Sequence, residues 1–361
     1  MNFSKLVKEE TEATALHTET VRKTDSLGFT KPRVYVPVIG LVFLVLLPLA
    51  VKQSYYLNIL NLMLLFASVG IAWNVLGGYA RQVSLGHGIF FGIGAYTSTL
   101  LQIYWNITPW VGMIVGGILA VVVGFIIGLG VFRLRGHYFA ISTIAYSTIV
   151  MLLFVKFYTI TGGAQGLSVP MRNSFWMMQF DGKLPYYYVF LAVMLIMVLV
   201  ARLIEKSRLG YYMIAMGQDE QAARAIGINI PKVKHTSFAI SAFCTAVIGT
   251  LYVQYMYFVE PAGIFSVQMS VEFALVSIVG GLGTVFGPVL GAFIMKPIVT
   301  LTNDYFGNVL PGLNYTIYGV ILILVIVLLP NGLIGPFSNG YRYLLSKLPG
   351  YRTDGKGGTK I

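Results

Sequence analysis

Residues 202–234 read RLIEKSRLGYYMIAMGQDEQAARAIGINIPKVK, a polar and mostly basic stretch between long apolar runs. Its basic residues are Arg202, Lys206, Arg208, Arg224, Lys232 and Lys234, and its acidic residues are Glu205, Asp219 and Glu220. On both sides the chain consists of apolar segments near the length of about 20 residues that crosses a hydrocarbon core. The stretch therefore predicts a polar loop at one membrane face, with membrane helices before and after it.

Composition supports the same fold class. Of the 361 residues, 57% are hydrophobic and only 11% are charged, whereas a soluble domain carries roughly a quarter charged residues. We expect an all-α polytopic membrane protein of about ten transmembrane segments. The predicted spans are 34–51, 57–76, 82–104, 109–131, 137–157, 186–204, 235–259, 266–283, 287–302 and 313–330. Glycine and polar residues interrupt 82–104 and 266–302, so either can be a broken or re-entrant helix, which would lower the count.

The charge distribution predicts topology. The tail 1–33 holds six Lys/Arg and five Asp/Glu, and the tail 331–361 holds five Lys/Arg against Asp354 alone. Short loops rich in Lys and Arg stay on the cytosolic side. We therefore expect a disordered cytosolic tail 1–33, a single transmembrane domain 34–330 whose cytosolic loop is 205–234, and a cytosolic tail 331–361. The basic residues do not alternate with exposed aromatic ones on a soluble unit, so no nucleic-acid partner is expected.

The sequence lacks the residue patterns that several kinds of chemistry require. The chain has one cysteine, Cys244, and four histidines, so no internal disulfide forms and no CxxC metal site exists. No GxxxxGK[ST] nucleotide-binding motif occurs. Catalytic His, Asp or Cys clusters do not assemble either. We therefore expect that this chain is not an enzyme and binds no cofactor or metal. Any use of ATP would require another chain.

A short helix is predicted around QAARAIG, residues 221–227. Asp219 is suited to accept the N–H groups of its first turn, and Glu220 adds negative charge near the helix N-terminus. Gly227 supplies a left-handed C-terminal residue, and Pro231 prevents continuation. The candidate residues are Asp219, Glu220, Gln221, Ala222, Ala223, Arg224 and Gly227. Such a helix either meets a soluble partner that moves it or simply lies in the membrane interface.

Two charged residues stand inside apolar runs. Glu272 lies in SVQMSVEFALVSIVGG, and an ionised group at mid-bilayer costs about 3 kcal/mol on insertion scales. Glu272 either lines a path and meets a solute ammonium, or has a structural partner near the outer interface. Lys296 can pair with Glu272 or extend its ammonium towards an interface.

The third segment begins with a polar cluster that includes Ser84 and His87. A helix that starts here can aim its unpaired N–H groups at a solute carboxylate, or His87 can form an ordinary hydrogen bond between helices. Tyr96 and Tyr146 can add hydroxyls to a path or hold helices together. The candidate path residues are Ser84, His87, Tyr96, Tyr146 and Glu272.

Five blocks of the chain resemble a known family. QAARAIG is similar to the EAAxxxG motif of bacterial ABC importer permeases, with Gln221 where the motif has Glu. The stretches 78–101, 133–150, 161–168, 223–243 and 271–293 resemble, in the same order, blocks of the LivM-type permease of branched-chain amino acid ABC transporters. The resemblance covers residues 35–335. Relatives of this permease also move urea, amides and aromatic acids, so the solute stays open.

The resemblance implies a permease subunit of the bacterial inner membrane, surrounded by membrane lipid, that moves branched-chain amino acids. It implies as partners a second permease of the LivH type, two ATP-binding subunits and a periplasmic solute-binding protein. In that assembly the 205–234 loop contacts the ATPases. The alternative of another class is an ion-coupled secondary transporter. That mechanism calls for paired intramembrane carboxylates, and Glu272 is the convincingly deep one.

Overall fold

The computed structural model describes residues 32–51, 53–134, 136–172 and 174–306, with positions 316, 319–320, 323, 327 and 332–336. Nearly all of the tail 1–33, most of the predicted span 313–330 and most of the tail 331–361 lie outside these residues. The chain divides into two compact units, 1–47 with 339–361, and 48–338. Helix α2 (Pro32–Ala50) falls mostly in the first unit.

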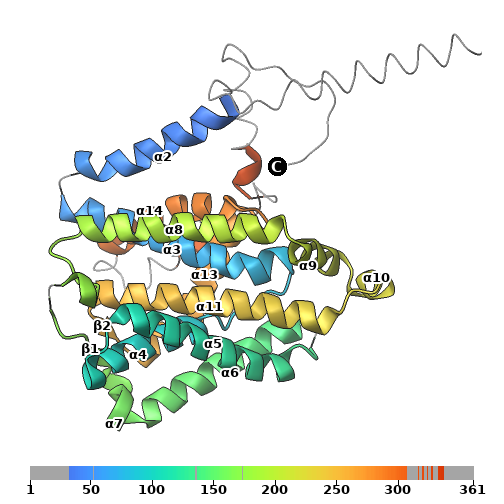
Figure 1. Cartoon of the computed structure of the whole chain (residues 1–361), viewed down its shortest axis with the longest axis horizontal. Coiled ribbons are helices and arrows are strands. Elements are labelled where there is room, and N and C mark those ends of the chain that lie inside the picture. The colour runs from blue at the N-terminus through green and yellow to red at the C-terminus, as the bar shows by residue number, and fades with distance from the viewer. Residues whose placement is uncertain are drawn as a thin grey trace, which may run out of the picture. The chain divides into compact units, whose positions relative to one another are not determined.

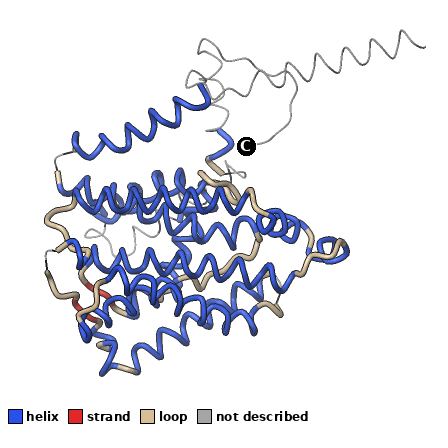
Figure 2. Tube along the Cα trace, in the orientation of Figure 1, coloured by secondary structure: helices blue, strands red, loops and turns tan. Residues whose placement is uncertain are grey.

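The second unit is helical almost throughout (Figures 1 and 2). Its long helices are α3 (Ser54–Asn74), α4 (Gly88–Trp105), α5 (Pro109–Val131), α6 (His137–Lys156), α8 (Leu184–Glu205), α11 (Ile230–Met256), α13 (Val267–Gly280) and α14 (Gly287–Phe306). Its shorter helices are α7 (Tyr158–Thr161), α9 (Arg208–Gln218), α10 (Glu220–Ala225) and α12 (Pro261–Ile264). A π-helical turn, Val75–Tyr79, and 3₁₀ turns at Gly163–Gln165 and Phe175–Met177 complete the helical elements.

Strand structure in the described residues is limited to one short ladder. Strands β1 (Leu167–Ser168) and β2 (Phe258–Val259) pair antiparallel. Figure 1 places this ladder and α7 at one end of the second unit, and α9 and α10 at the other end. The two ends of the bundle are therefore distinguished by different local structures.

The long helices pack in two groups that share α11. Helix α11 contacts α4 and α5, and it also contacts α3, which in turn contacts α8, α13 and α14. The packing is close: a Cβ on Gly94 of α4 would lie 1.9 Å from the carbonyl oxygen of Ala246 on α11. Small residues let helix backbones approach in this way, which favours association in lipid.

Six helices of the described residues are long and apolar enough to cross a membrane. They are Ser54–Tyr79, Pro109–Val131, His137–Lys156, Leu184–Glu205, Ile230–Met256 and Pro261–Gly280. The expected all-helical membrane fold is confirmed, whereas the count of ten spans is not and stays a prediction.

Two predicted boundaries differ from the structure. Segment 82–104 becomes helical only at Gly88, because an irregular linker, residues 80–87, follows the π-helical turn. Helix α11 begins at Ile230, and Pro231 lies in its first turn. Proline fits the first turn because its missing N–H would have no partner there. Pro231 therefore starts the next helix, and the interpretation of it as only a stop was incomplete.

Candidate functional site

The loop between α8 and α11 folds into two short helices joined at Asp219. The Oδ1 atom of Asp219 accepts the N–H groups of Gln221 and Ala222, at 2.7 and 3.0 Å. These backbone hydrogen bonds stabilise the carboxylate, so they lower the pKa of Asp219 below its ordinary value. The negative cap and Glu220 in the first turn both suit the positive end of the α10 dipole.

Gly227 ends α10 as the sequence predicts. Its φ is +86°, a left-handed conformation that glycine adopts without strain. The N–H of Gly227 donates to Arg224 O at 3.0 Å, and the N–H of Ile228 donates to Ala223 O at 3.1 Å. These two bonds form a Schellman motif, and the buried side chains of Ala223 and Ile228 complete it. Helix α10 is thus defined at both ends by local hydrogen bonds.

Helix α10 is fastened to the bundle on its inner side by an ion pair. The Lys234 Nζ lies 2.5 Å from Glu220 Oε1, and the two side chains are 4% and 21% exposed. The Nε2 of Gln82 donates to the same Glu220 oxygen at 3.4 Å. Because Gln82 belongs to the linker 80–87 ahead of α4, one carboxylate connects α10 to α11 and to that linker.

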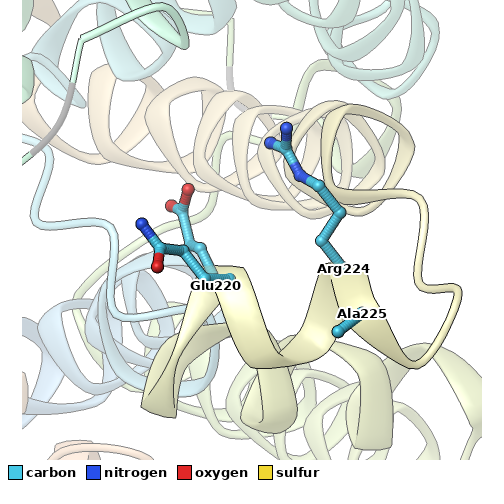
Figure 3. Close-up of a pocket in the computed structure, with 4 residues that line it drawn as sticks. Glu220, Arg224 and Ala225 are labelled. Atoms are coloured by element: carbon cyan, nitrogen blue, oxygen red, sulfur yellow. The ribbon is translucent and has the colours of Figure 1, made fainter.

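Much of α10 outside this ion pair is exposed. Gln221, Ala222, Arg224 and Ala225 are exposed, and Ile226 exposes 76% of its surface. Figure 3 shows Glu220 and Arg224 extending to the same side of α10, where they line a pocket together with Gln221 and Ala225. The short helix therefore exposes an amide, a guanidinium and an isoleucine, while the Glu220–Lys234 ion pair and the buried Ala223 attach it to the bundle.

Ser84 and His87 lie together in a closed polar cluster. Ser241 Oγ donates to Ala72 O at 2.7 Å, so it accepts from His87 Nε2 at 2.8 Å. That tautomer leaves His87 Nδ1 to accept from Ser84 Oγ at 3.0 Å. Both residues are buried, and Trp73 Nε1 donates to Ser84 O at 2.8 Å. In this conformation the cluster joins α3, α4 and α11 through satisfied hydrogen bonds.

A backbone N–H group in the first turn of α4 also has a hydrogen-bond partner within the protein. The N–H of Gly88 donates to Ser270 Oγ of α13 at 2.8 Å. Tyr96, further along α4, is buried against Phe154 and Phe265. Tyr146 of α6 is partly buried against the core, near Gly130 of α5. The structure thus brings Ser84 to His87, and the role of Ser84, His87, Tyr96 and Tyr146 in a path stays a prediction.

Glu272 and Lys296 meet between α13 and α14. The Lys296 Nζ lies 2.9 Å from Glu272 Oε2, and the side chains are 11% and 19% exposed. The Lys296 ammonium also lies 3.3 Å from the centroid of the Phe66 ring on α3, a cation–π contact. Of the two alternatives for Lys296, the structure has it paired with Glu272.

Three contacting residues were missed at the sequence level. Lys234 was counted only as a loop charge, and Gln82 was not singled out. Asn74, which received no role, accepts from Gly283 N at 3.0 Å and donates to Thr284 O at 2.9 Å. It holds the α13–α14 turn against the end of α3. For Asn74 the available signal was an amide inside an apolar run, because such side chains require partners there.

Comparisons with known proteins agree on one family. A family model described as "Branched-chain amino acid transport system / permease component" matches residues 55–326. The LivM high-affinity branched-chain amino acid permease of Escherichia coli K12 is 28% identical over 300 residues, 77% of this chain and 69% of the relative. A probable LivM of Methanocaldococcus jannaschii is 26% identical over 314 residues, 78% and 90% of the two chains. The LivH permease of Salmonella typhimurium LT2 is 25% identical over 287 residues, 75% and 91%. No solved structure matches the chain significantly.

Proposed function

This chain belongs to the permease component family of branched-chain amino acid transport systems, and on that premise we propose that it forms the translocation path of an ATP-driven importer. The observation that carries the proposal is the family match over residues 55–326. The proposed solutes are branched-chain amino acids, because the named LivM and LivH relatives transport them. The chain is a transport permease of the membrane, and ATP hydrolysis is assigned to partner subunits.

We assign a LivM role within a two-permease assembly. In Escherichia coli the LivM and LivH relatives are 28% and 25% identical to this chain. We propose that a LivH-type permease pairs with this chain, that two ATP-binding subunits dock below, and that a periplasmic binding protein delivers the solute. The chain then lies in a bacterial inner membrane with both termini in the cytosol.

The proposed docking element for the ATPases is α10. Its exposed Gln221, Arg224 and Ile226 give a polar and apolar surface for a cleft on the partner. Its inner carboxylate, Glu220, is held by Lys234 and Gln82. A push on α10 would thus act directly on α11 and on the linker ahead of α4. This arrangement supports a coupling helix over a helix that merely lies in the interface.

An ion-coupled mechanism receives less support. Proton or sodium coupling calls for carboxylates that load and release the ion within the membrane. The deep carboxylate, Glu272, is already paired with Lys296 at 2.9 Å. The reading that uses ATP explains both the family match and the exposed α10.

The direct test is reconstitution. The chain, its LivH-type partner and the ATP-binding subunits are placed in vesicles with ATP inside and the solute-binding protein outside. We expect uptake of radiolabelled leucine that requires ATP and persists when ionophores collapse ion gradients. Uptake without ATP that stops with the ionophores would replace the proposal by ion coupling.

A second test addresses α10. Gly227→Val places a β-branched residue at φ +86°, which strains the end of α10. Gly182→Val is the matched control, because Gly182 has φ +77° and, like Gly227, nothing within 4 Å of an added Cβ. We expect Gly227→Val to lose substrate-stimulated ATP hydrolysis and Gly182→Val to keep it. Equal coupling in both variants would remove α10 from the mechanism.

A further inference from the structure

The ion pair of α13 and α14 lies on a polar stripe. Gln268 and Glu272 are four residues apart on α13, and Lys296 and Thr300 are four apart on α14. Residues at this spacing share one helix face. Gln268 is exposed, and Thr300 is half-buried. The two faces therefore carry polar groups next to the pair in helices that are otherwise largely apolar.

Contacts at the two ends of α14 show which end of the polar stripe lies closer to α10. Tyr55, at the start of α3, donates to Asp304 near the end of α14 at 2.5 Å. The opposite end of α14 follows the 281–286 turn, where the Arg202 guanidinium lies 5.0 Å from the Phe286 ring centroid. Arg202 belongs to the last turn of α8, next to α9. The turn is therefore at the α9–α10 end.

It follows that Gln268 and Thr300 lie on the side of the pair away from α10. On the other side, one turn closer to α10, stand Leu275 of α13 and Phe293 of α14, which are both half-buried. The sequence of groups along the two helices is polar, charged and then apolar. A small amphipathic molecule with both charges at one end has the same order.

Among the described residues, the hydrogen-bonding capacity of the pair is not fully used. Lys296 bonds Oε2 of Glu272, and within the described residues the other oxygen, Oε1, accepts no hydrogen bond. An ammonium has three N–H donors. The Lys296 ammonium uses one donor on Glu272, and it lies 3.3 Å from the centroid of the Phe66 ring. The Glu272 carboxylate, about one-fifth exposed, would not face lipid, because a charge there costs about 2.5–3.5 kcal/mol. Its open side thus needs a polar or charged occupant.

Stability alone does not explain the pair. Replacing a buried ion pair by apolar side chains of similar volume is often neutral or stabilising. We propose that Glu272 and Lys296 form a binding site for the charged groups of a zwitterionic amino acid. The solute ammonium bonds Oε1 of Glu272 and the solute carboxylate bonds the Lys296 ammonium. The aliphatic side chain lies against Leu275 and Phe293. The inference rests on the proposed function in that it takes the solute to be an amino acid.

The first experiment measures binding to the wild-type complex. The purified transporter, without its solute-binding protein, is titrated with L-leucine, leucinol and 4-methylpentanoate by saturation-transfer NMR. Leucinol lacks the carboxylate, and 4-methylpentanoate lacks the ammonium. A lost charge-assisted hydrogen bond weakens binding by about tenfold or more, so we expect leucine to bind at least that much more tightly than either analogue.

The second experiment changes the site. The double variant Glu272→Gln/Lys296→Gln removes both charges together and leaves no charge unpaired, so it keeps the fold. Glu260→Gln is the control, because Glu260 is an exposed carboxylate ahead of α12. We expect the double variant to bind leucine at least about tenfold more weakly and the control to bind it as the wild type does. Size-exclusion profile and basal ATP hydrolysis report assembly.

Several results overturn the inference. They are equal binding of leucine and either analogue by the wild type, wild-type affinity in the double variant, and no leucine binding by the wild type. ATP-driven leucine uptake by the same preparation separates the two proposals. Uptake together with any of these three results refutes the site and leaves the proposed function standing. Absent uptake by the wild type refutes the function.

Discussion

The described residues contain two glutamate–lysine ion pairs that share a chemistry and differ in surroundings. Glu220–Lys234 joins α10 to α11 at 2.5 Å, and Glu272–Lys296 joins α13 to α14 at 2.9 Å. In each, the lysine is nearly buried and the glutamate is about one-fifth exposed. In each, one carboxylate oxygen makes no hydrogen bond within the described residues.

The difference lies in what reaches the open oxygen. At Glu220 the open side faces the pocket beside α10 (Figure 3), where water can solvate it. At Glu272 the open side lies between helices that we place in the membrane, where water is scarce unless a path supplies it. The Glu220–Lys234 pair therefore attaches α10 to α11 at the polar loop. The Glu272–Lys296 pair, inside the bundle, is left incompletely hydrogen-bonded within the described residues.

Removing one charge from the inner pair should have the largest effect. Lys296→Met leaves the Glu272 carboxylate without a cation, and breaking a buried pair costs about 3–5 kcal/mol in free energy of unfolding. We expect a clearly lower thermal midpoint for the purified complex. The double variant Glu272→Gln/Lys296→Met should recover most of the loss. If single and double variants unfold alike, the charge is not the source of the cost.

Removing the outer lysine should have a smaller effect on stability. Lys234→Met leaves Glu220 able to reach water, so we expect a loss of about 1–3 kcal/mol. Coupling should suffer more, because α10 loses its tie to α11, and substrate-stimulated ATP hydrolysis is the measurement. Lys232→Met is the matched control, since Lys232 is exposed two residues away. Unchanged coupling in Lys234→Met would make the outer pair purely structural.

The cap of α10 should have the smallest effect. Asp219→Ala removes the acceptor of the Gln221 and Ala222 N–H groups, and we expect faster amide exchange over residues 220–225. Asp219→Asn should exchange close to the wild-type rate, because asparagine also caps helices. Equal exchange in the alanine variant and the wild type would show that the ion pair alone holds α10.

The pH dependence of this cap has a definite sign. Because the pKa of Asp219 is lowered in the folded chain, the cap contributes fully above the unfolded aspartate value of about 3.9. Its contribution is lost as pH falls through the lower folded value. Protection of residues 220–225, corrected for intrinsic exchange, should therefore stay constant from about pH 5 to pH 8. A loss of protection between pH 5 and pH 8 would show that a group other than Asp219 determines the pH dependence of α10.

Prediction from sequence succeeded where the interactions are local. Asp219 and its two N–H partners are two and three residues apart, and the left-handed Gly227 follows from the end of the same short helix. Prediction was weaker where one residue suits two neighbouring elements. Pro231 is equally compatible with ending α10 and with starting α11, and only the cap by Asn229, which accepts from Lys232 N at 3.1 Å, decides between them.

The candidate path residues illustrate the other limit. Because these polar residues stand in apolar runs, the sequence indicated that each needs a partner. It did not indicate which residue that partner is. His87 meets Ser241, which is 154 residues away, and Tyr96 contacts aromatic rings from other segments. Such contacts depend on how helices pack, which residue type alone does not specify.

The amino-acid sequence by itself determined the helical membrane class, the position of the polar loop and the two ends of α10. These depend on apolar length and on hydrogen bonds between residues a few positions apart. Only the tertiary structure decided that Glu220 meets Lys234 and Gln82, and that Glu272 meets Lys296 over the ring of Phe66. The depth and rotation of each helix bring those groups together, and both arise from packing along whole helices.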